Sequence, residues 1–437
     1  MEISVERYHY PIGQGIFSAQ IVRAFDEQYV CVYDCGSTAK TLVKDYVKDL
    51  RYKTLWYKED RSEKPIIDLL VISHLDNDHC NAIEYLFDEG FSVRKLVIPY
   101  MSMIERIIFL IKHPGRIKNI KSWILWKSQI LIPDGGGNGQ LLDNLERVEI
   151  IESSSGVSVD NFNVDMINPT DPQQPIPVWE FLHFPLFDGA EDSVREDFII
   201  EFENAVHGFL GKGINDITIA DLDANLEDFK TAYKSTRKII GGKHGIKYND
   251  IFNASSVILY TGPSNELLKL NKNSWEVSRR SQGKQVVGRY GIPDVYRIED
   301  FCHHSHNNNL EYTGGWLGTG DALLKEPANI RELNANLGWE RIDRIRVLTV
   351  PHHGSRGNSN DEFYSIFSQP RVECIVHSYP AHQKFRHPHD EVKEAIARKG
   401  FVEVPVTKEK ESYYAEYNTT VQGSLCFSRC IHGPYYC

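Results

Sequence analysis

The chain has 437 residues, of which 41% are hydrophobic and 25% are charged, and its formal net charge is −11. This composition is that of a globular protein with one large domain or two ordinary ones. The acidic balance disfavours nonspecific binding of the whole surface to polyanions, but it leaves room for local basic patches that contact phosphate. No apolar run is long enough to span a bilayer, the first residues lack the pattern of a signal peptide, and eight scattered cysteines do not suggest a disulfide framework. We therefore expect a cytoplasmic protein without a membrane partner.

The first 57 residues predict three strands followed by a helix. Segments with the apolar spacing of strands start at Tyr8, Ser18 and Tyr29, and the third of them ends at Asp34. The segment 37–57 has charged residues on its outer face, which is typical of a surface helix.

The apolar run 66–72 is short and bounded by polar residues, so it predicts a buried strand. The segment 80–87 has a helical spacing of apolar residues and stops at Gly90, a natural residue beyond a helix end. A further strand is expected over 93–99. The polar residues between the first strand and the helix must therefore lie on a tight turn.

Four residues of ligand type occupy that turn: His74, Asp76, Asp78 and His79. Alternate residues of an extended backbone point the same way, so His74 and Asp76 should lie together. The change of direction should then turn Asp78 and His79 toward a second point nearby. Imidazoles and carboxylates bind divalent cations. A polar turn that caps the helix is the simpler alternative, but it accounts poorly for two histidines interleaved with two aspartates.

This order of residues resembles the His-x-His-x-Asp-His signature of the metallo-β-lactamase-fold hydrolases, with Asp76 in place of the second histidine. The variant is similar to one branch in particular, the nuclease-like domain of DNA-uptake (competence) proteins, and to choline-phosphate esterases. The resemblance implies an α/β fold, more closely a four-layer αββα sandwich with helical insertions. It also implies two divalent metal ions, Zn²⁺ or Mn²⁺, at one edge of the sheets.

Two further aspartates match this family in order. Asp34 corresponds to an aspartate that supports the metal ligands through hydrogen bonds, although an ordinary turn would explain it equally well. Asp321 follows a predicted strand in the segment Leu-Gly-Thr-Gly-Asp. By resemblance it is the carboxylate that bridges the two metals.

Histidines follow two later predicted strands. His352 and His353 end the apolar strand 345–350; by resemblance one completes the metal held by Asp78 and His79, and the other orients substrate or water. Ser355 stands two residues after His353, and we expect it to contact substrate. His387 matches a His-Pro pair of the same branch and should contact substrate or metal, with a plain loop as the alternative.

One family ligand has no clear counterpart in this chain. A single histidine usually stands between the first signature and the bridging aspartate. His183 is the nearest candidate, but it lies inside an apolar strand pattern and is expected to be a core histidine. The first metal would then rest on His74, Asp76 and Asp321 plus water or His387. This oxygen-rich set favours Mn²⁺ or Mg²⁺ more than a typical zinc site does.

We expect one domain over residues 1–425, two insertions at 101–140 and about 200–312, and a cysteine-containing tail over 426–437. The first insertion reads as a helical hairpin with a basic face. Its Lys112, Arg116 and Lys121 are candidate substrate-binding residues, although a merely solvated face is an alternative.

These motifs favour a metal-dependent hydrolase, specifically a two-metal phosphodiesterase or nuclease acting on nucleic acid. Its candidate catalytic residues are Asp78, His353 and His387. The alternatives are a hydrolase of a small phosphoester, cyclic nucleotide or lactone, and a non-catalytic partner subunit with a vestigial metal site. A defence effector switched on by a protein partner fits by analogy alone.

Overall fold

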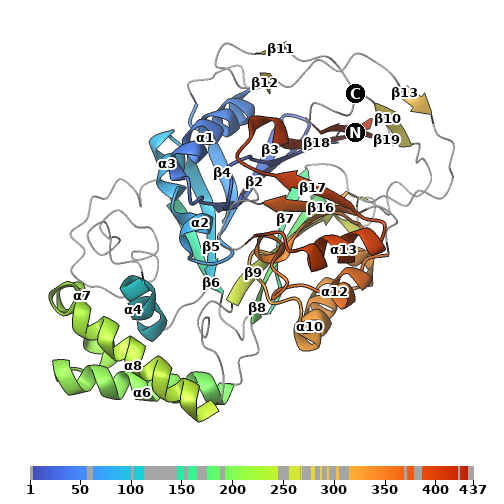
Figure 1. Cartoon of the computed structure of the whole chain (residues 1–437). Helices are drawn as coiled ribbons and strands as arrows, with labels where there is room; N and C mark the ends of the chain where they lie inside the picture. The colour runs from blue at the N-terminus through green and yellow to red at the C-terminus, as the bar shows by residue number, and fades with distance from the viewer. Residues whose placement is uncertain are drawn as a thin grey trace.

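The computed structural model describes residues 3–56, 63–99, 103–112, 145–151, 156–164, 175–187, 192–244, 255–265, 267, 277–280, 286–287, 293–294, 302–304, 314–368, 372–377, 386–421 and 424–431. These residues form a mixed α/β protein with two multi-stranded sheets and helices outside them (Figure 1). The predicted α/β class is therefore confirmed.

The first sheet combines strands from both ends of the chain. In spatial order it contains β13 (Cys302–His304), β10 (Val277–Arg280), β19 (Ser424–Ile431), β18 (Tyr414–Val421), β1 (Ile3–His9), β2 (Phe17–Ala24), β3 (Glu27–Cys35), β4 (Ile66–Val71), β5 (Ser92–Pro99) and β6 (Leu145–Ile151). The strands β3 to β6 run parallel, so their carboxyl ends lie at the same edge.

The second sheet is built mostly from the second half of the chain. In spatial order it contains β17 (Val402–Val406), β16 (Glu373–His377), β15 (Ile345–Thr349), β14 (Gly315–Gly318), β9 (Ser255–Pro263), β8 (Ile176–Phe187) and β7 (Ser158–Val164). Here β14 to β17 are parallel, whereas β7, β8, β9 and β14 alternate in direction. A separate pair is formed by β11 (Val286–Val287) and β12 (Pro293–Asp294).

The strands β1 to β5 of the first sheet contribute buried side chains on both faces. Successive residues of a strand point to opposite faces, so Val30 and Val32 of β3 pack outward while Cys31 and Tyr33 pack inward. The outward residues join a core with the helices α1 (Lys40–Leu55) and α3 (Ile83–Asp88). The inward residues share a core with the second sheet, including Trp179 and Trp316.

Helices cover the outer face of the second sheet as well (Figure 1). Side chains of α10 (Pro327–Leu337), α12 (Asp361–Ser365) and α13 (Asp390–Arg398) share a core with β9, β14, β15 and β16. The short helix α11 (Trp339–Ile342) leads from α10 into β15. These layers bury the parallel strands on both sides, as their continuous apolar runs predict.

A group of helices at the lower left of Figure 1 has a core of its own. It consists of α4 (Met103–Lys112), α6 (Asp192–Leu210), η4 (Ile214–Asp216), α7 (Ile219–Ala224) and α8 (Leu226–His244). Apolar residues of α4 share this core with Phe198 of α6 and Phe229 of α8. The rest of the predicted 101–140 hairpin lies outside the described residues. Of the helices described, none combines the length and apolar character that crossing a bilayer requires.

Two predicted boundaries differ from the structure. The range 200–312 is not one continuous insertion, because β9 lies within it and pairs with β8 and β14. The expected tail starts inside β19, which pairs with β18. The side chains of the second half of β18 and of β19 are not among those described, so only their backbone placement is known.

The two ends of the chain meet in the first sheet. The strand β1 lies between β2 and β18, and His9 is opposite Tyr414. The fully buried guanidinium of Arg7 pairs with Glu416 of β18 and donates a 2.9 Å hydrogen bond to the carbonyl of Gly314, just before β14. This contact ties both ends of the chain to the second sheet.

Candidate metal centre

The histidine–aspartate turn follows β4 at the carboxyl edge of the parallel strands. Asp76 keeps an extended backbone (φ −65°, ψ 156°), and the short helix α2 (Asn77–Cys80) starts directly after it. The helix therefore begins earlier than the predicted residue 80 and breaks before α3. A Cβ at Gly36 would lie 2.4 Å from the backbone nitrogen of Cys80, so only glycine lets β3 approach this turn so closely.

Asp34 lies beneath the turn and is completely buried. It has a positive φ of 57°, a conformation that aspartate tolerates better than most residues. One carboxylate oxygen accepts the backbone N–H of Ser73 at 2.7 Å. The other accepts the Ser73 hydroxyl at 2.7 Å and Nδ1 of His79 at 2.8 Å. Asp34 thus fixes both the backbone and one imidazole of the turn.

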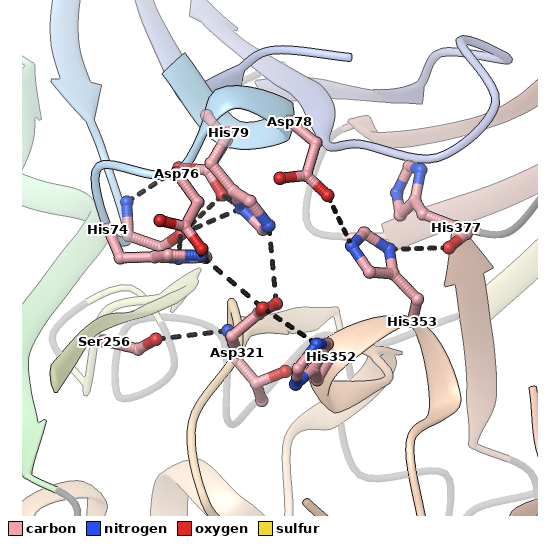
Figure 2. Close-up of polar contacts among 12 residues, drawn as sticks. His74, Asp76, Asp78, His79, Ser256, Asp321, His352, His353 and His377 are labelled. Carbon is pink, nitrogen blue, oxygen red and sulfur yellow. Dashed lines mark hydrogen bonds and ion pairs between the residues drawn. The ribbon is translucent and has the colours of Figure 1, made fainter. Parts of the chain in front are cut away.

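These contacts determine which nitrogen of each imidazole faces the centre. His79 donates its Nδ1 hydrogen to Asp34, so its Nε2 carries a lone pair. The Ser73 hydroxyl donates to Asp34 and is therefore left to accept from Nδ1 of His74, 3.1 Å away. Both Nε2 atoms face Asp321, as Figure 2 shows.

Asp321 reaches the turn from the second sheet. Its backbone N–H donates to the hydroxyl of Ser256 at 3.1 Å. Gly320 before it has φ 51°, and a Cβ there would lie 2.6 Å from that of Ser73, so the glycine allows the two loops to meet. The carboxylate lies 3.5 Å from Nε2 of His74 and 3.4 Å from Nε2 of His79.

The histidine pair after β15 completes the group. His353 donates from Nδ1 to the carbonyl of His377 at 2.8 Å, and its Nε2 lies 3.3 Å from Asp78. His352 has its Nε2 3.4 Å from Asp321. Both histidines have positive φ (46° and 56°), the left-handed region that β-strands do not use. This sharp bend at the strand end turns both rings toward the aspartates (Figure 2).

The result is a buried cluster of electron-pair acceptors. Nε2 of His74, His79 and His353 and one oxygen of Asp321 are buried without a hydrogen-bond partner. Two sets of three residues place one ligand atom each within 4.8 Å of one another: His74, His79 and Asp321, and Asp78, His79 and His353. Lone pairs and carboxylates that face one another repel unless a cation or a proton lies between them.

The pKa shifts of three members of the group agree with this demand for positive charge. Burial alone would lower the pKa of His79, but Asp321 and Asp34 raise it well above its usual value. Burial likewise opposes charge on His353, and Asp78 nevertheless raises its pKa. The pKa of Asp321 is lowered despite its burial, because His352, His74 and His79 surround it. The pKa of His74 shifts the other way, because burial and the neighbouring His79 lower it.

Comparison with known proteins does not name a family. No family model matches this chain, and a search of curated proteins finds no relative.

The remaining predicted site residues take various positions. Asp76 has a carboxylate oxygen 3.9 Å from Nε2 of His74, at the more exposed side of the turn. The ring of His387 lies 5.6 Å from that of His352, and burial, followed by the neighbouring His352, lowers its pKa to about 4. The Ser355 hydroxyl accepts the backbone N–H of Gly357 and so shapes its own loop.

The predicted basic residues are not placed at the centre by the structure. Lys112 is the last residue of α4, while Arg116 and Lys121 lie outside the described residues. His183, the nearest candidate for the missing family ligand, is buried 3.2 Å from Glu149 and 3.6 Å from Asp160. Its role as a core histidine agrees with the prediction.

Sequence reasoning did not single out the residues that support the ligands. Ser73, Ser256, Asn358 and the carbonyl of His377 each hold a ligand or its loop. Of these, Ser73 offered a local signal, because it directly precedes His74 on the turn. The others lie far from their partners along the chain.

Proposed function

We propose that the cluster binds two divalent cations. His74 and Asp321 would hold one ion, with Asp76 close by, and Asp78, His79 and His353 would hold the other, because the single Nε2 lone pair of His79 can bind one ion only. The observation that carries this proposal is that every one of these histidines has Nδ1 engaged by an acceptor, so that all their Nε2 lone pairs converge on two carboxylates. Histidine and aspartate together suit Zn²⁺ or Mn²⁺.

We further propose that the two sheets form the four-layer αββα sandwich of the metallo-β-lactamase fold. Three core clusters support this arrangement: one between the first sheet and its helices, one between the sheets, and one between the second sheet and its helices. The position of the centre, at the carboxyl ends of parallel strands of both sheets, is in keeping with it.

The activity that we propose is hydrolysis of a phosphodiester, with nucleic acid as the substrate. Divalent cations bound here would supply a water of lowered pKa and neutralise charge on a phosphate. Exposed cationic side chains lie on the loops of the later histidines: Arg386 precedes His387, and Arg356 follows Ser355 and pairs with Glu391 at 3.0 Å. Guanidinium groups at such positions can pair with phosphate oxygens, which supports a phosphate-bearing substrate.

The protein's own groups would orient the metal ligands and transfer protons. Asp34 and the His377 carbonyl hold His79 and His353 in fixed orientations, so the geometry is set before substrate arrives. His352 lies on the more open side of the centre, with the ring of His387 5.6 Å away, and there it can exchange protons with water or with a leaving group.

The test is a double substitution at the turn. We expect the wild-type protein to retain about two metal ions per chain and to cleave DNA or RNA with Mn²⁺ or Zn²⁺. D78A/H79A should lose both properties. D216A/H207A, which removes an exposed aspartate and an exposed histidine from the helical group, is the matched control and should behave as wild type.

Two outcomes would count against the proposal in different ways. Cleavage that survives D78A/H79A would rule out this site as the catalytic centre. Hydrolysis of bis-(p-nitrophenyl) phosphate without cleavage of any nucleic acid would leave the phosphodiesterase in place and reject nucleic acid as its substrate.

A further inference from the structure

The loop that follows the histidine pair folds back onto the loop of Asp321. Asn358 is buried in this loop, and its backbone N–H donates to the carbonyl of Ser355 at 3.0 Å. Its side-chain nitrogen donates to the carbonyl of Asp321 at 2.8 Å. Its side-chain oxygen lies 3.0 Å from Nδ1 of His352. One amide therefore joins a proposed metal ligand to a neighbouring histidine.

The orientation of this amide follows from its partners. The carbonyls of Asp321 and Ala322 can only accept hydrogen bonds, so the nitrogen of Asn358 must face them. The oxygen is then left to face His352 and can only accept. His352 must carry its hydrogen on Nδ1, which leaves a lone pair on Nε2, 3.4 Å from Asp321.

His352 differs from the other three histidines in its access to solvent. Its side chain is 38% exposed, whereas those of His74, His79 and His353 are at most 7% exposed. It also belongs to neither of the two sets of converging ligands. Its free nitrogen therefore faces the side of the centre from which water and substrate would come.

We propose that Asn358 is a positioning residue that fixes the tautomer of His352, so that Nε2 acts as a hydrogen-bond acceptor beside Asp321. This inference rests on the proposed hydrolase function of the centre. In it, Nε2 of His352 accepts a hydrogen bond from the attacking water and aligns that water with the phosphate. Without the amide, the ring can rotate or carry its hydrogen on Nε2, and the acceptor is lost.

A double-mutant cycle tests whether Asn358 acts through His352. N358L keeps the side-chain size but removes the side-chain hydrogen bonds to Asp321, Ala322 and His352. We expect N358L and H352A each to lower kcat for bis-(p-nitrophenyl) phosphate by about 10- to 100-fold, the usual effect of losing a partner that orients a site residue. KM and metal content should stay near wild type. The double variant N358L/H352A should be no worse than H352A, because the two residues act as one unit.

Two further variants separate positioning from loop structure. N358D keeps an oxygen facing His352 and should lose less activity than N358L. N360A removes the cap of α12 and a hydrogen bond to the carbonyl of Lys325 in the same loop, and should leave kcat unchanged. If N358L lowered kcat as much in the H352A background as in wild type, Asn358 would act on the loop alone and the proposal would be wrong.

A spectroscopic readout does not depend on activity. In metal-free protein with ¹⁵N-labelled histidine, long-range ¹H–¹⁵N spectra at pH 8 should show His352, assigned by its absence in H352A, with hydrogen on Nδ1. The N358L variant should shift it toward hydrogen on Nε2. Hydrogen on Nε2 in the wild type would overturn the inference even if the protein is an active hydrolase. An inactive wild type with hydrogen on Nδ1 would instead reject the proposed function while leaving the placement of the ring intact.

Discussion

Asparagine in place of Asp34 should disable the centre without changing its shape. In D34N the side-chain oxygen can still accept the backbone N–H of Ser73, as one carboxylate oxygen does now at 2.7 Å. The amide nitrogen then takes the place of the oxygen that accepts from His79 at 2.8 Å. Since an amide nitrogen only donates, Nδ1 of His79 must become an acceptor and its hydrogen must move to Nε2. A protonated Nε2 cannot bind a metal ion.

The loss of metal affinity expected in D34N has a known order of magnitude. The Nε2 of His79 has one lone pair, so its reversal removes a ligand from one of the two ions. Loss of a partner that orients a metal-bound histidine typically lowers metal affinity about 10- to 100-fold. This corresponds to about 1.4 to 2.7 kcal/mol for that ion. Competition with a chromophoric chelator, titrated with Zn²⁺ and with Mn²⁺, measures this change directly.

The matched control is another buried aspartate of the same sheet. Asp68 of β4 accepts the backbone N–H of Val30 at 2.7 Å and pairs with Arg94, but it contacts none of the proposed ligands. D68N should weaken folding while leaving metal affinity at the wild-type value. Wild-type affinity in D34N, or an equal loss of affinity in D68N, would refute the tautomer reasoning.

Three other predictions follow from the described contacts. Metal ions should raise the melting temperature of wild type but not of D78A/H79A, since a ligand at 100 times its Kd adds about 2.7 kcal/mol of stability; equal shifts in both proteins would place the ions elsewhere. G36A should lower both stability and metal affinity, because its Cβ would lie 2.4 Å from the backbone nitrogen of Cys80. The control G242A places its Cβ in open space on α8 and should leave metal affinity unchanged. Chelator competition and urea unfolding measure the two effects. Finally, burial, and then the neighbouring His353, lowers the pKa of His377 to about 3, and burial lowers that of His9 well below its usual value. At these two positions the unfolded chain therefore binds more protons than the folded one below about pH 6.5. Each of the two histidines should then reduce the free energy of unfolding by about 1.4 kcal/mol for each pH unit below that value, and should cause no such loss above it. Urea unfolding at pH 7.5 and 5 should show a smaller loss in H377N than in wild type, and an identical loss would contradict this origin.

The parts of the centre that were predictable are local in sequence. The turn 74–79 follows an uninterrupted apolar strand, so both its ligand types and its position at a strand end can be read from one short segment. Asp321 and the pair His352 and His353 also stand directly after apolar strands. Because parallel strands carry their carboxyl ends to one edge, the structure brings these separate segments together.

The supporting residues could not be predicted because their function depends on distant partners. Asn358 is an ordinary loop asparagine until its amide meets Asp321 and His352. The contribution of His377 is a backbone carbonyl, which has no sequence signature at all. The strand β18 was missed for a related reason. Its polar residues do not form an apolar run, and its place in the sheet comes from pairing with β1, about 400 residues earlier.

The pairing of β1 with β18 affects how the protein folds during its synthesis on the ribosome. Chains emerge from their amino end first, and every proposed ligand has been synthesised by residue 353. At that point β1 still has an open edge, and the charge of Arg7 still lacks Glu416. The first sheet is complete only after β18 and β19 have been synthesised. A nascent or truncated chain therefore contains all of the proposed ligands but lacks these two strands of the sheet.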